Sequence, residues 1–530
     1  MNTLRSRCAR LVVALACCLP LTACDDKKMT AAKPAARGEY AVPMAAATAP
    51  NAPDRAEPAN TENYQHFVEN DFVSAAAEPR STFSASVDTA AYTIIRAKIQ
   101  SGQLPPKGAV RVADMLNYFD YDYPKPTGDN PIAATLEMAP CPWNPKHHLL
   151  RIALAAKQFS HADMPPRNLV FLIDTSGSMA GANRLPLVKE SLQLLTQTLT
   201  ARDRVSIVTY AGDSSVRLEP IAGDQKARIN AVIESLSAYG STNGGGGIQA
   251  AYAQAAKAYI DGGVNRVILA TDGDFNVGVS SESELVRLIE EKRKTGVYLT
   301  VLGFGMGNLQ DAKLEKLAHH GNGHYAYVDS LDEARKLFLD QGGALAIVAK
   351  DVKLQLEFNH NRVNAYRLIG YENRLLKNED FRNDEKDAGD MGSGHTVTAL
   401  YEVVPVGVPI RLAIPGDLKY QGKTDTPAAQ SGEWLTLRVR YKHPDTDAAK
   451  ELEFPLGKDG LKSKGSTDFQ FASAVAAFGL LLRDSEYKGT ASWAGVTEWA
   501  AAGLGHDQKA YRSDFLDLVQ QAERLAGKKD

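Results

Sequence analysis

At 530 residues the chain is too long for one hydrophobic core, so we expect several domains. Hydrophobic residues make up 44% and charged residues 23%, a composition typical of globular proteins and not of disordered ones. The formal net charge of −3 provides no basic surplus, so we expect no nucleic acid among the partners.

The first 24 residues have the layout of an export signal. Arginines precede an apolar stretch of about a dozen residues, which is too short to span a bilayer. The letters LTAC that follow resemble the bacterial lipobox, which implies cleavage before Cys24 and attachment of a diacylglycerol to its thiol. The alternative is an ordinary secretory signal with an incidental cysteine. Asp25 resembles the enterobacterial signal for retention at the inner membrane, so we expect a lipid-anchored envelope protein that faces the periplasm.

Residues 25–62 are rich in alanine and proline and hold few large apolar side chains. Such a segment cannot bury enough surface to order itself, so we interpret it as a disordered tether. The mature chain would keep Cys24, lipidated, and Cys141 as its cysteines. That leaves no pair for an intramolecular disulfide, and we expect Cys141 to be a buried, small, apolar residue.

Residues 63–165 are expected to combine helices with two strands. The stretch DTAAYTIIRAKIQSG predicts a helix with a cap at Asp88 or Thr89. The tyrosine-rich NYFDYDYP could form a binding patch, but aromatic packing at a domain edge is the favoured interpretation. His147 and His148 are neighbours on a strand and face opposite sides, so we interpret them as solvent or edge residues and not as metal ligands.

Residues 166–345 carry a different pattern, in which short, continuously apolar strands alternate with helical stretches. Strands that are apolar on both faces indicate a parallel sheet covered on both sides by helices. We therefore expect an α/β fold, a doubly wound, mostly parallel, Rossmann-like sheet, whose ligands bind at the carboxyl ends of the strands. The strands are NLVFLID, RVSIVTY, RVILATD and VYLTVLGF, and the helices span 184–200, 224–237, 247–261, 282–295 and 310–320.

Strict alternation of apolar and polar residues returns in residues 346–460, which predicts a β-sandwich-like domain. Because the strands before the α/β domain show the same alternation of apolar and polar residues, we expect the α/β domain to be inserted into one β domain built from 132–158 and 350–457. Residues 461–530 are expected to be helical. There Thr467 and Gln470 suggest a capping box, and FQFASAVAAFGLLL suggests a buried core helix.

Oxygen-bearing side chains gather at the expected ligand-binding edge of the parallel sheet. Asp174, Ser176 and Ser178 follow the first strand, Thr242 lies in a glycine-rich loop before a helix, and Asp272 follows another apolar strand. Two carboxylates and three hydroxyls are hard donors, the kind that Mg²⁺ and Mn²⁺ prefer. The sequence therefore predicts a Mg²⁺ or Mn²⁺ site with no histidine or thiolate ligand.

Asp-x-Ser-x-Ser, a Gly-x-Thr loop and Thr-Asp-Gly together resemble the metal-ion-dependent adhesion site of von Willebrand factor A (VWA) domains. The five residues named above match its five positions. With NYFDYDYP and VNAYRLIGYENR, they resemble a family of bacterial VWA lipoproteins with a distinctive N-terminal domain and a C-terminal domain of unknown function. Asp274 and Asn276 are further polar groups beside the site, which could support the ligands or shape the loop.

The resemblance implies metal-dependent protein binding, in which an Asp or Glu of a partner protein completes the coordination of the ion. By analogy with adhesive VWA domains, occupancy could be relayed through residues 330–345. One alternative is a Mg²⁺-dependent envelope hydrolase. Against it, Ser176 stands where a phosphatase of the aspartyl-nucleophile type has a second Asp, and we assign no catalytic residue. Another alternative, a substrate adaptor for an ATP-driven chaperone, conflicts with the export signal.

Overall fold

The computed structural model describes residues 60–160, 162–241, 244–273, 281–412, 425–446 and 448–528. The chain divides into two compact units, Met1–Glu57 and Pro58–Asp530, and every described residue belongs to the second. Within the described ranges, no helix is both long enough and apolar enough to cross a membrane.

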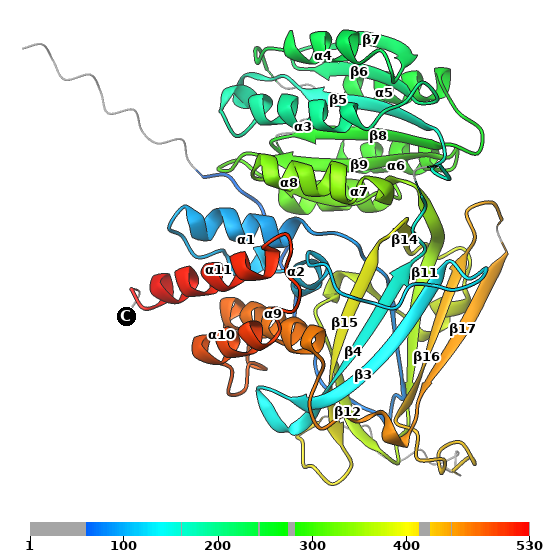
Figure 1. Cartoon of the computed structure of the whole chain (residues 1–530), viewed down its shortest axis with the longest axis vertical. Coiled ribbons are helices and arrows are strands. Elements are labelled where there is room, and N and C mark those ends of the chain that lie inside the picture. The colour runs from blue at the N-terminus through cyan, green and yellow to red at the C-terminus, as the bar shows by residue number, and fades with distance from the viewer. Residues whose placement is uncertain are drawn as a thin grey trace, which may run out of the picture. The chain divides into compact units, whose positions relative to one another are not determined.

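A six-stranded sheet with the order β10-β9-β8-β5-β6-β7 forms the centre of the α/β domain (Figure 1). Its neighbouring strands are parallel except for β6 and β7, which confirms the doubly wound, mostly parallel fold. The antiparallel edge strand β7 was not among the expected strands. The strands are β5 (Arg167–Asp174), β6 (Arg204–Tyr210), β7 (Ser214–Ala222), β8 (Val264–Thr271), β9 (Val297–Phe304) and β10 (Tyr325–Val328).

Strand β5 explains why these strands are apolar throughout, since all eight of its residues are buried. Its side chains alternate between two cores: Val170 and Leu172 pack on one face of the sheet, and Phe171 and Ile173 pack on the other. Helices α5, α6 and α7 supply the first core, and α3, α4 and α8 supply the second. The helices are α3 (Leu185–Gln197), α4 (Lys226–Glu234), α5 (Gly244–Lys257), α6 (Glu282–Arg293), α7 (Asp311–His320) and α8 (Leu331–Arg335), which continues as the π-helical turn η3 (Lys336–Asp340) and the 3-10 turn η4 (Gly342–Leu345).

Two further sheets, β1-β12-β15-β4-β3 and β13-β2-β11-β16-β17, share one core. Strand β4 precedes the α/β domain in sequence and pairs antiparallel with β15, which follows it, with Leu150 opposite Tyr401. This pairing confirms that the α/β domain is inserted into one β domain. The strands are β1 (Val73–Ser74), β2 (Arg80–Ser84), β3 (Ile132–Cys141), β4 (Asn144–Ala156), β11 (Ile347–Phe358), β12 (Val363–Ile369), β13 (Leu375–Leu376), β14 (Gly389–Gly392), which pairs with β11, β15 (Thr396–Pro405), β16 (Leu435–Lys442) and β17 (Ala449–Leu456).

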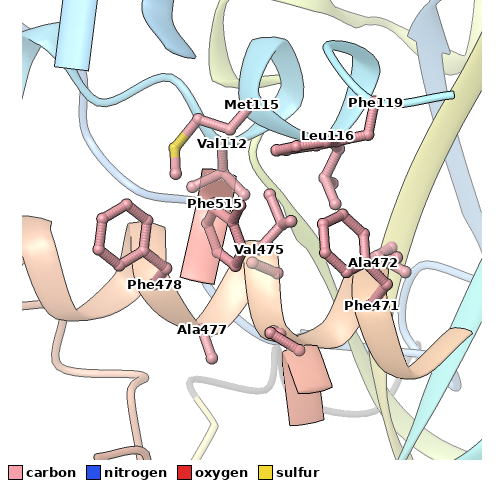
Figure 2. Close-up of a cluster of buried hydrophobic side chains, with 14 of the residues drawn as sticks. Val112, Met115, Leu116, Phe119, Phe471, Ala472, Val475, Ala477, Phe478 and Phe515 are labelled. Atoms are coloured by element: carbon pink, nitrogen blue, oxygen red, sulfur yellow. The ribbon is translucent and has the colours of Figure 1, made fainter. Parts of the chain in front are cut away.

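The C-terminal helices pack against two helices from the N-terminal part of the chain. Figure 2 shows Phe471, Val475 and Phe478 of α9 facing Val112 and other apolar side chains of α2. This confirms FQFASAVAAFGLLL as a buried core helix. The helices are α1 (Ala90–Gln100), α2 (Val112–Asn117), α9 (Thr467–Arg483), α10 (Trp493–Ala502) and α11 (Tyr511–Ala526), and the remaining 3-10 turns are η1 (Lys107–Ala109), η5 (Glu372–Arg374), η6 (Asn378–Arg382) and η7 (Lys458–Gly460).

The expected capping box of α9 was wrong by one residue. Ser466 is the N-cap, and its side chain accepts a hydrogen bond from the backbone N–H of Phe469, while Thr467 is already helical. The aromatic motif NYFDYDYP packs as favoured, with Tyr118, Phe119, Tyr121 and Tyr123 all buried. Cys141 is buried as well, which confirms that prediction.

The interpretation of His147 as a solvent or edge residue was also wrong. Its side chain is buried, and Nδ1 lies 2.6 Å from Oε1 of Glu402 on the neighbouring strand β15. The reason is that both faces of β4 are covered: Leu149 packs in the core that includes the C-terminal helices, and Leu150 packs in the core between the two sheets. His148 is half-buried against the ring of Trp434, and burial lowers its pKa.

Buried ion pairs connect the α/β domain to the helical part of the chain. Arg111, which precedes α2, forms a two-pronged pair with Asp311 at the start of α7. Arg96 of α1 lies 2.6 Å from Asp329 and 2.9 Å from Glu333 of α8. Because these charges are removed from water and paired, they set the orientation of α7 and α8 against the rest of the fold.

Candidate metal centre

Asp174 is the last residue of β5, and its side chain is buried at the carboxyl edge of the sheet. Oδ1 accepts a hydrogen bond from the backbone N–H of Ser176 at 2.9 Å. Oδ2 accepts hydrogen bonds from the hydroxyls of Tyr210 and Thr271, each at 3.1 Å. Both donors come from the ends of the strands on either side of β5, so the sheet itself orients this carboxylate.

Ser176 and Ser178 follow β5 in a loop that begins the short 3-10 turn η2 (Gly177–Ala180). Their hydroxyl oxygens lie 3.0 Å apart. Ser176 is buried, and Ser178 is partly exposed. The structure therefore places two hydroxyls side by side next to a buried carboxylate, with one of them open to an approaching partner.

Asp272 follows β8, the strand next to β5, and its side chain is also buried. Its Oδ2 accepts a hydrogen bond from Nδ2 of Asn308 at 2.9 Å and lies 3.3 Å from Nη1 of Arg184. Burial, with a smaller contribution from the negative charge of Asp272, raises the pKa of Asp174 to about 6, although the hydrogen bonds from Ser176 and Tyr210 lower it. A buried carboxyl beside a second carboxylate forms a setting that a divalent cation stabilises.

The loop that should supply Thr242 runs beside the first loop. Tyr239 donates its backbone N–H to the carbonyl of Thr175 at 2.8 Å, and Gly177 donates to the carbonyl of Gly240 at 3.0 Å. Thr242 itself lies outside the described residues, as do Asp274, Asn276 and Cys24. The predictions for these four residues therefore stay predictions.

The glycine run after this loop has a packing role at one position. A Cβ at Gly247 would lie 2.8 Å from Cβ of Tyr210 and 3.2 Å from Cδ1 of Leu172. Glycine here lets α5 lie directly on β5 and β6, which keeps Tyr210 in reach of Asp174. At Gly246 an added Cβ would meet only the side chain of Ser214, at 3.2 Å.

Sequence reasoning missed four residues of this site: Tyr210, Thr271, Arg184 and Asn308. Thr271 had a signal, since it precedes Asp272 in the motif that suggested the site. The other three belong to loops or strands with no motif of their own. Within the described residues, no group of three or more His, Cys, Asp or Glu side chains is arranged to hold a metal ion. The candidate centre has only two acids, and hydroxyls complete its donor set. These hard oxygen donors fit Mg²⁺ or Mn²⁺.

Three family models match the chain, and the middle one coincides with the α/β domain. They are "von Willebrand factor" over residues 58–151, "von Willebrand factor type A domain" over 168–340 and "Uncharacterized protein YfbK, C-terminal" over 343–525. The sheet with its edge of acids and hydroxyls is thus a VWA domain. The "Uncharacterized protein YfbK" of Escherichia coli (strain K12) is 43% identical over 477 residues, which are 87% of this chain and 81% of that protein. The chain belongs to the YfbK family of bacterial VWA proteins.

Two more distant relatives match shorter parts. The "Uncharacterized protein sll0103" of Synechocystis sp. is 32% identical over 189 residues, which are 36% of this chain and 44% of that protein. The human "Inter-alpha-trypsin inhibitor heavy chain H4" is 27% identical over 308 residues, which are 55% of this chain and 29% of that protein. Each match leaves more than half of the relative uncovered.

Proposed function

We propose that this chain is a metal-dependent protein-binding lipoprotein of the bacterial cell envelope, acting in adhesion or as a scaffold. The observation that carries the proposal is the group formed by Asp174, Ser176 and Ser178 at the carboxyl end of β5, with Asp272 after the adjacent strand. Membership of the chain in a family of VWA proteins supports it, because VWA domains are typically protein-interaction modules.

The ion would be held by Asp174, Ser176, Ser178, Thr242 and Asp272. Mg²⁺ or Mn²⁺ bound there supplies an electrophile that can accept a carboxylate oxygen from outside the chain. The residues around it have separate tasks: Tyr210 and Thr271 fix the direction of the Asp174 carboxylate through their hydrogen bonds.

The mouth of the site offers a surface for a partner. Ser178 is partly exposed and Gly177 is exposed, and the ring of Tyr239 is 59% exposed on the adjoining loop. Because the backbone N–H of Tyr239 is bonded to the carbonyl of Thr175, this exposed aromatic residue adjoins the loop of Ser176 and Ser178 and offers a partner an apolar contact. The partner is therefore a protein that presents an Asp or Glu next to an apolar residue.

The proposal assigns no catalytic step to this site. A Mg²⁺-dependent hydrolase would need an acid or base poised for the reaction, and Ser176 occupies the place of the second Asp of aspartyl-nucleophile phosphatases. The hydroxyl of Ser176 is instead engaged with that of Ser178. Both groups are used as ligands in the proposed role.

The location of the protein is part of the proposal and rests on the signal-like N-terminus. Lipid attached to Cys24 would anchor the chain in the membrane, and Asp25 favours the inner membrane over the outer one. Metabolic labelling with palmitate tests the anchor: label should enter the wild-type chain and be lost in Cys24→Ser. Label that persists in Cys24→Ser would refute the anchor.

Capture of a partner tests the binding function. The full-length chain, extracted in detergent and immobilised, is exposed to envelope extract in Mg²⁺ and Mn²⁺ or in EDTA. We expect a protein that is retained only with metal, and that is lost with Asp174→Ala. Asp224→Ala is the matched control, because Asp224 is an exposed acid of the same domain beyond the last residue of β7. Retention of a partner that is unchanged by EDTA and by Asp174→Ala would contradict the proposal.

A further inference from the structure

Arg184 lies against the acids of the candidate metal centre, although no motif pointed to it. It occupies the N-cap position of α3, and its side chain is 18% exposed. The guanidinium donates to the carbonyl of Ser178, to the carbonyl of Met306 at 2.8 Å and to Oδ1 of Asn308 at 2.7 Å. Its Nη1 also forms the ion pair with Oδ2 of Asp272 at 3.3 Å.

The loop after β9 is shaped to receive this side chain. Gly305 has a φ of +70°, and a Cβ built there would lie 2.6 Å from Cγ and 2.9 Å from Cδ of Arg184. A glycine is thus required both by the backbone conformation and by the space that the arginine takes. With Met306 and Asn308 as acceptors, the loop holds the guanidinium as a fixed charge and not as a mobile surface group.

The charge of Arg184 changes the electrostatic balance of the site. A divalent cation beside the two carboxylates of Asp174 and Asp272 would form a neutral group, with no net attraction for a further anion. The guanidinium adds one positive charge, so the same group carries a net charge of plus one. In a partly buried site this difference is weakly screened. The guanidinium would also compete with the ion for the Asp272 carboxylate. Arg184 and Asn308 both contact the same oxygen of that carboxylate, Oδ2.

We propose that Arg184 tunes this site for an outside carboxylate: it weakens the hold of the chain on the metal ion and strengthens the hold of the bound ion on a partner's Asp or Glu. This inference rests on the proposed function, since it assumes a divalent cation at Asp174 and Asp272. Arg184 is then a specificity-determining residue that acts through Asp272 and the ion, without touching the partner.

A purely structural role for Arg184 makes a different prediction. If the guanidinium served only to join the loops of Ser178 and Asn308, its loss would loosen the site and weaken the binding of metal and carboxylate together. The charge-tuning role predicts that loss of the guanidinium strengthens the binding of the metal and weakens the binding of the carboxylate. Metal and carboxylate affinities measured on the same variants therefore separate the two roles.

The experiment uses the full-length chain with Mn²⁺ as the metal and acetate as the carboxylate. Calorimetry measures the affinity for Mn²⁺ alone, and water-proton relaxation of the Mn²⁺ complex measures acetate binding, with acetamide as the uncharged control. The variants are Arg184→Gln and Arg184→Lys, which keeps the charge. Arg167→Gln is the matched control, because it removes a buried arginine, paired with Asp203 at 3.1 Å, from the opposite end of β5.

For Arg184→Gln we expect Mn²⁺ to bind about threefold tighter or more and acetate about fivefold weaker or more, as the loss of one nearby charge requires. Arg184→Lys should stay close to wild type in both, and Arg167→Gln should change thermal stability but neither affinity. Mn²⁺ and acetate affinities that fall together in Arg184→Gln, or that do not change, would overturn the inference while leaving the proposed function intact. A wild-type chain that binds no Mn²⁺ would overturn both.

Discussion

The carboxylate of Glu62 and the ammonium of Lys98 form a buried ion pair of 2.5 Å, with both side chains almost fully covered. Glu62 lies at the beginning of the described chain, and its other oxygen accepts the backbone N–H of Gly307 at 2.8 Å. Gly307 belongs to the loop that carries Asn308, the donor to Asp272. The N-terminal segment is thus bound to the same loop that supports the candidate metal centre.

Glu62→Ala should therefore affect both stability and metal binding. It leaves Lys98 buried without its counter-charge, which we expect to cost about 3–5 kcal/mol. It also removes the acceptor of the Gly307 N–H and so releases the loop of Gly307 and Asn308, and the affinity for Mn²⁺ should fall. Thermal unfolding and Mn²⁺ calorimetry measure the two effects. The double variant Glu62→Ala/Lys98→Met should recover stability but not Mn²⁺ affinity, and recovery of both would show that the loop does not depend on Glu62.

Two neighbouring glycines of α5 should respond in opposite ways to alanine. Gly247→Ala drives a Cβ into Tyr210 at 2.8 Å, so we expect a loss of about 1–3 kcal/mol in unfolding free energy and weaker Mn²⁺ binding. Gly246→Ala meets only a movable side chain and should stabilise the chain by about 0.5–1 kcal/mol, because alanine favours the helix. Thermal melts and Mn²⁺ titrations of both variants test this. Equal changes in thermal stability and Mn²⁺ affinity in the two variants would contradict the packing role assigned to Gly247.

Asp390 on β14 predicts how stability varies with pH. Burial raises its pKa to about 7, since only Oδ1 has a described donor, the backbone N–H of Asp351 at 3.0 Å. An acid whose pKa is raised in the folded state contributes most stability below its unfolded pKa of about 4 and loses this contribution as the pH rises through about 7. Asp390→Asn should therefore be more stable than wild type at pH 8, by on the order of 2–4 kcal/mol.

Denaturant unfolding at pH 5 and pH 8 provides the measurement for Asp390. The gain from Asp390→Asn should be smaller at pH 5 than at pH 8, because the wild-type carboxyl is largely protonated in the folded chain at pH 5. Asp459→Asn, at an exposed position in η7, is the control and should change little at either pH. A gain that is the same at both pH values would rule out titration of Asp390 as its cause.

Helix α8 offers a test of relay from the site. Met179, next to Ser178 of the candidate metal centre, and Phe338 of η3 belong to one core, and α3 contacts the turns that carry both. Glu333 of α8 is held by Arg96 and by the hydroxyl of Tyr118, each at 2.9 Å. We expect hydrogen exchange in residues 331–340 to slow when Mg²⁺ and a captured partner bind. Exchange that is identical to that of the EDTA-treated chain would count against a relay through this helix.

Much of the candidate site could be predicted because its signal is local in sequence. An apolar strand that ends in Asp174, with Ser176 and Ser178 after it, places these oxygens at the carboxyl edge of a parallel sheet. The same holds for Asp272 after β8. The insertion of the VWA domain into a β domain could also be predicted. Strands with alternating apolar and polar residues precede and follow the VWA domain in sequence, and their apolar faces need a common core.

The rest depended on contacts between distant segments. His147 is buried because segments distant in sequence pack around it: Glu402 of β15, 255 residues later, lies 2.6 Å from its Nδ1, and Leu149 on the same face of β4 belongs to the core of the C-terminal helices. Arg184 and Asn308 contact Asp272, and Glu62 holds the loop of Asn308 through Gly307. The three come from segments with no pattern in common, and only the folded chain brings them together. A period of two or of 3.6 residues determines which face of an element is apolar, whereas the partner of a charged side chain is decided by which elements pack together. The sequence alone therefore determined the VWA sheet and the acids and hydroxyls at its carboxyl edge, and the tertiary structure decided which charges surround them.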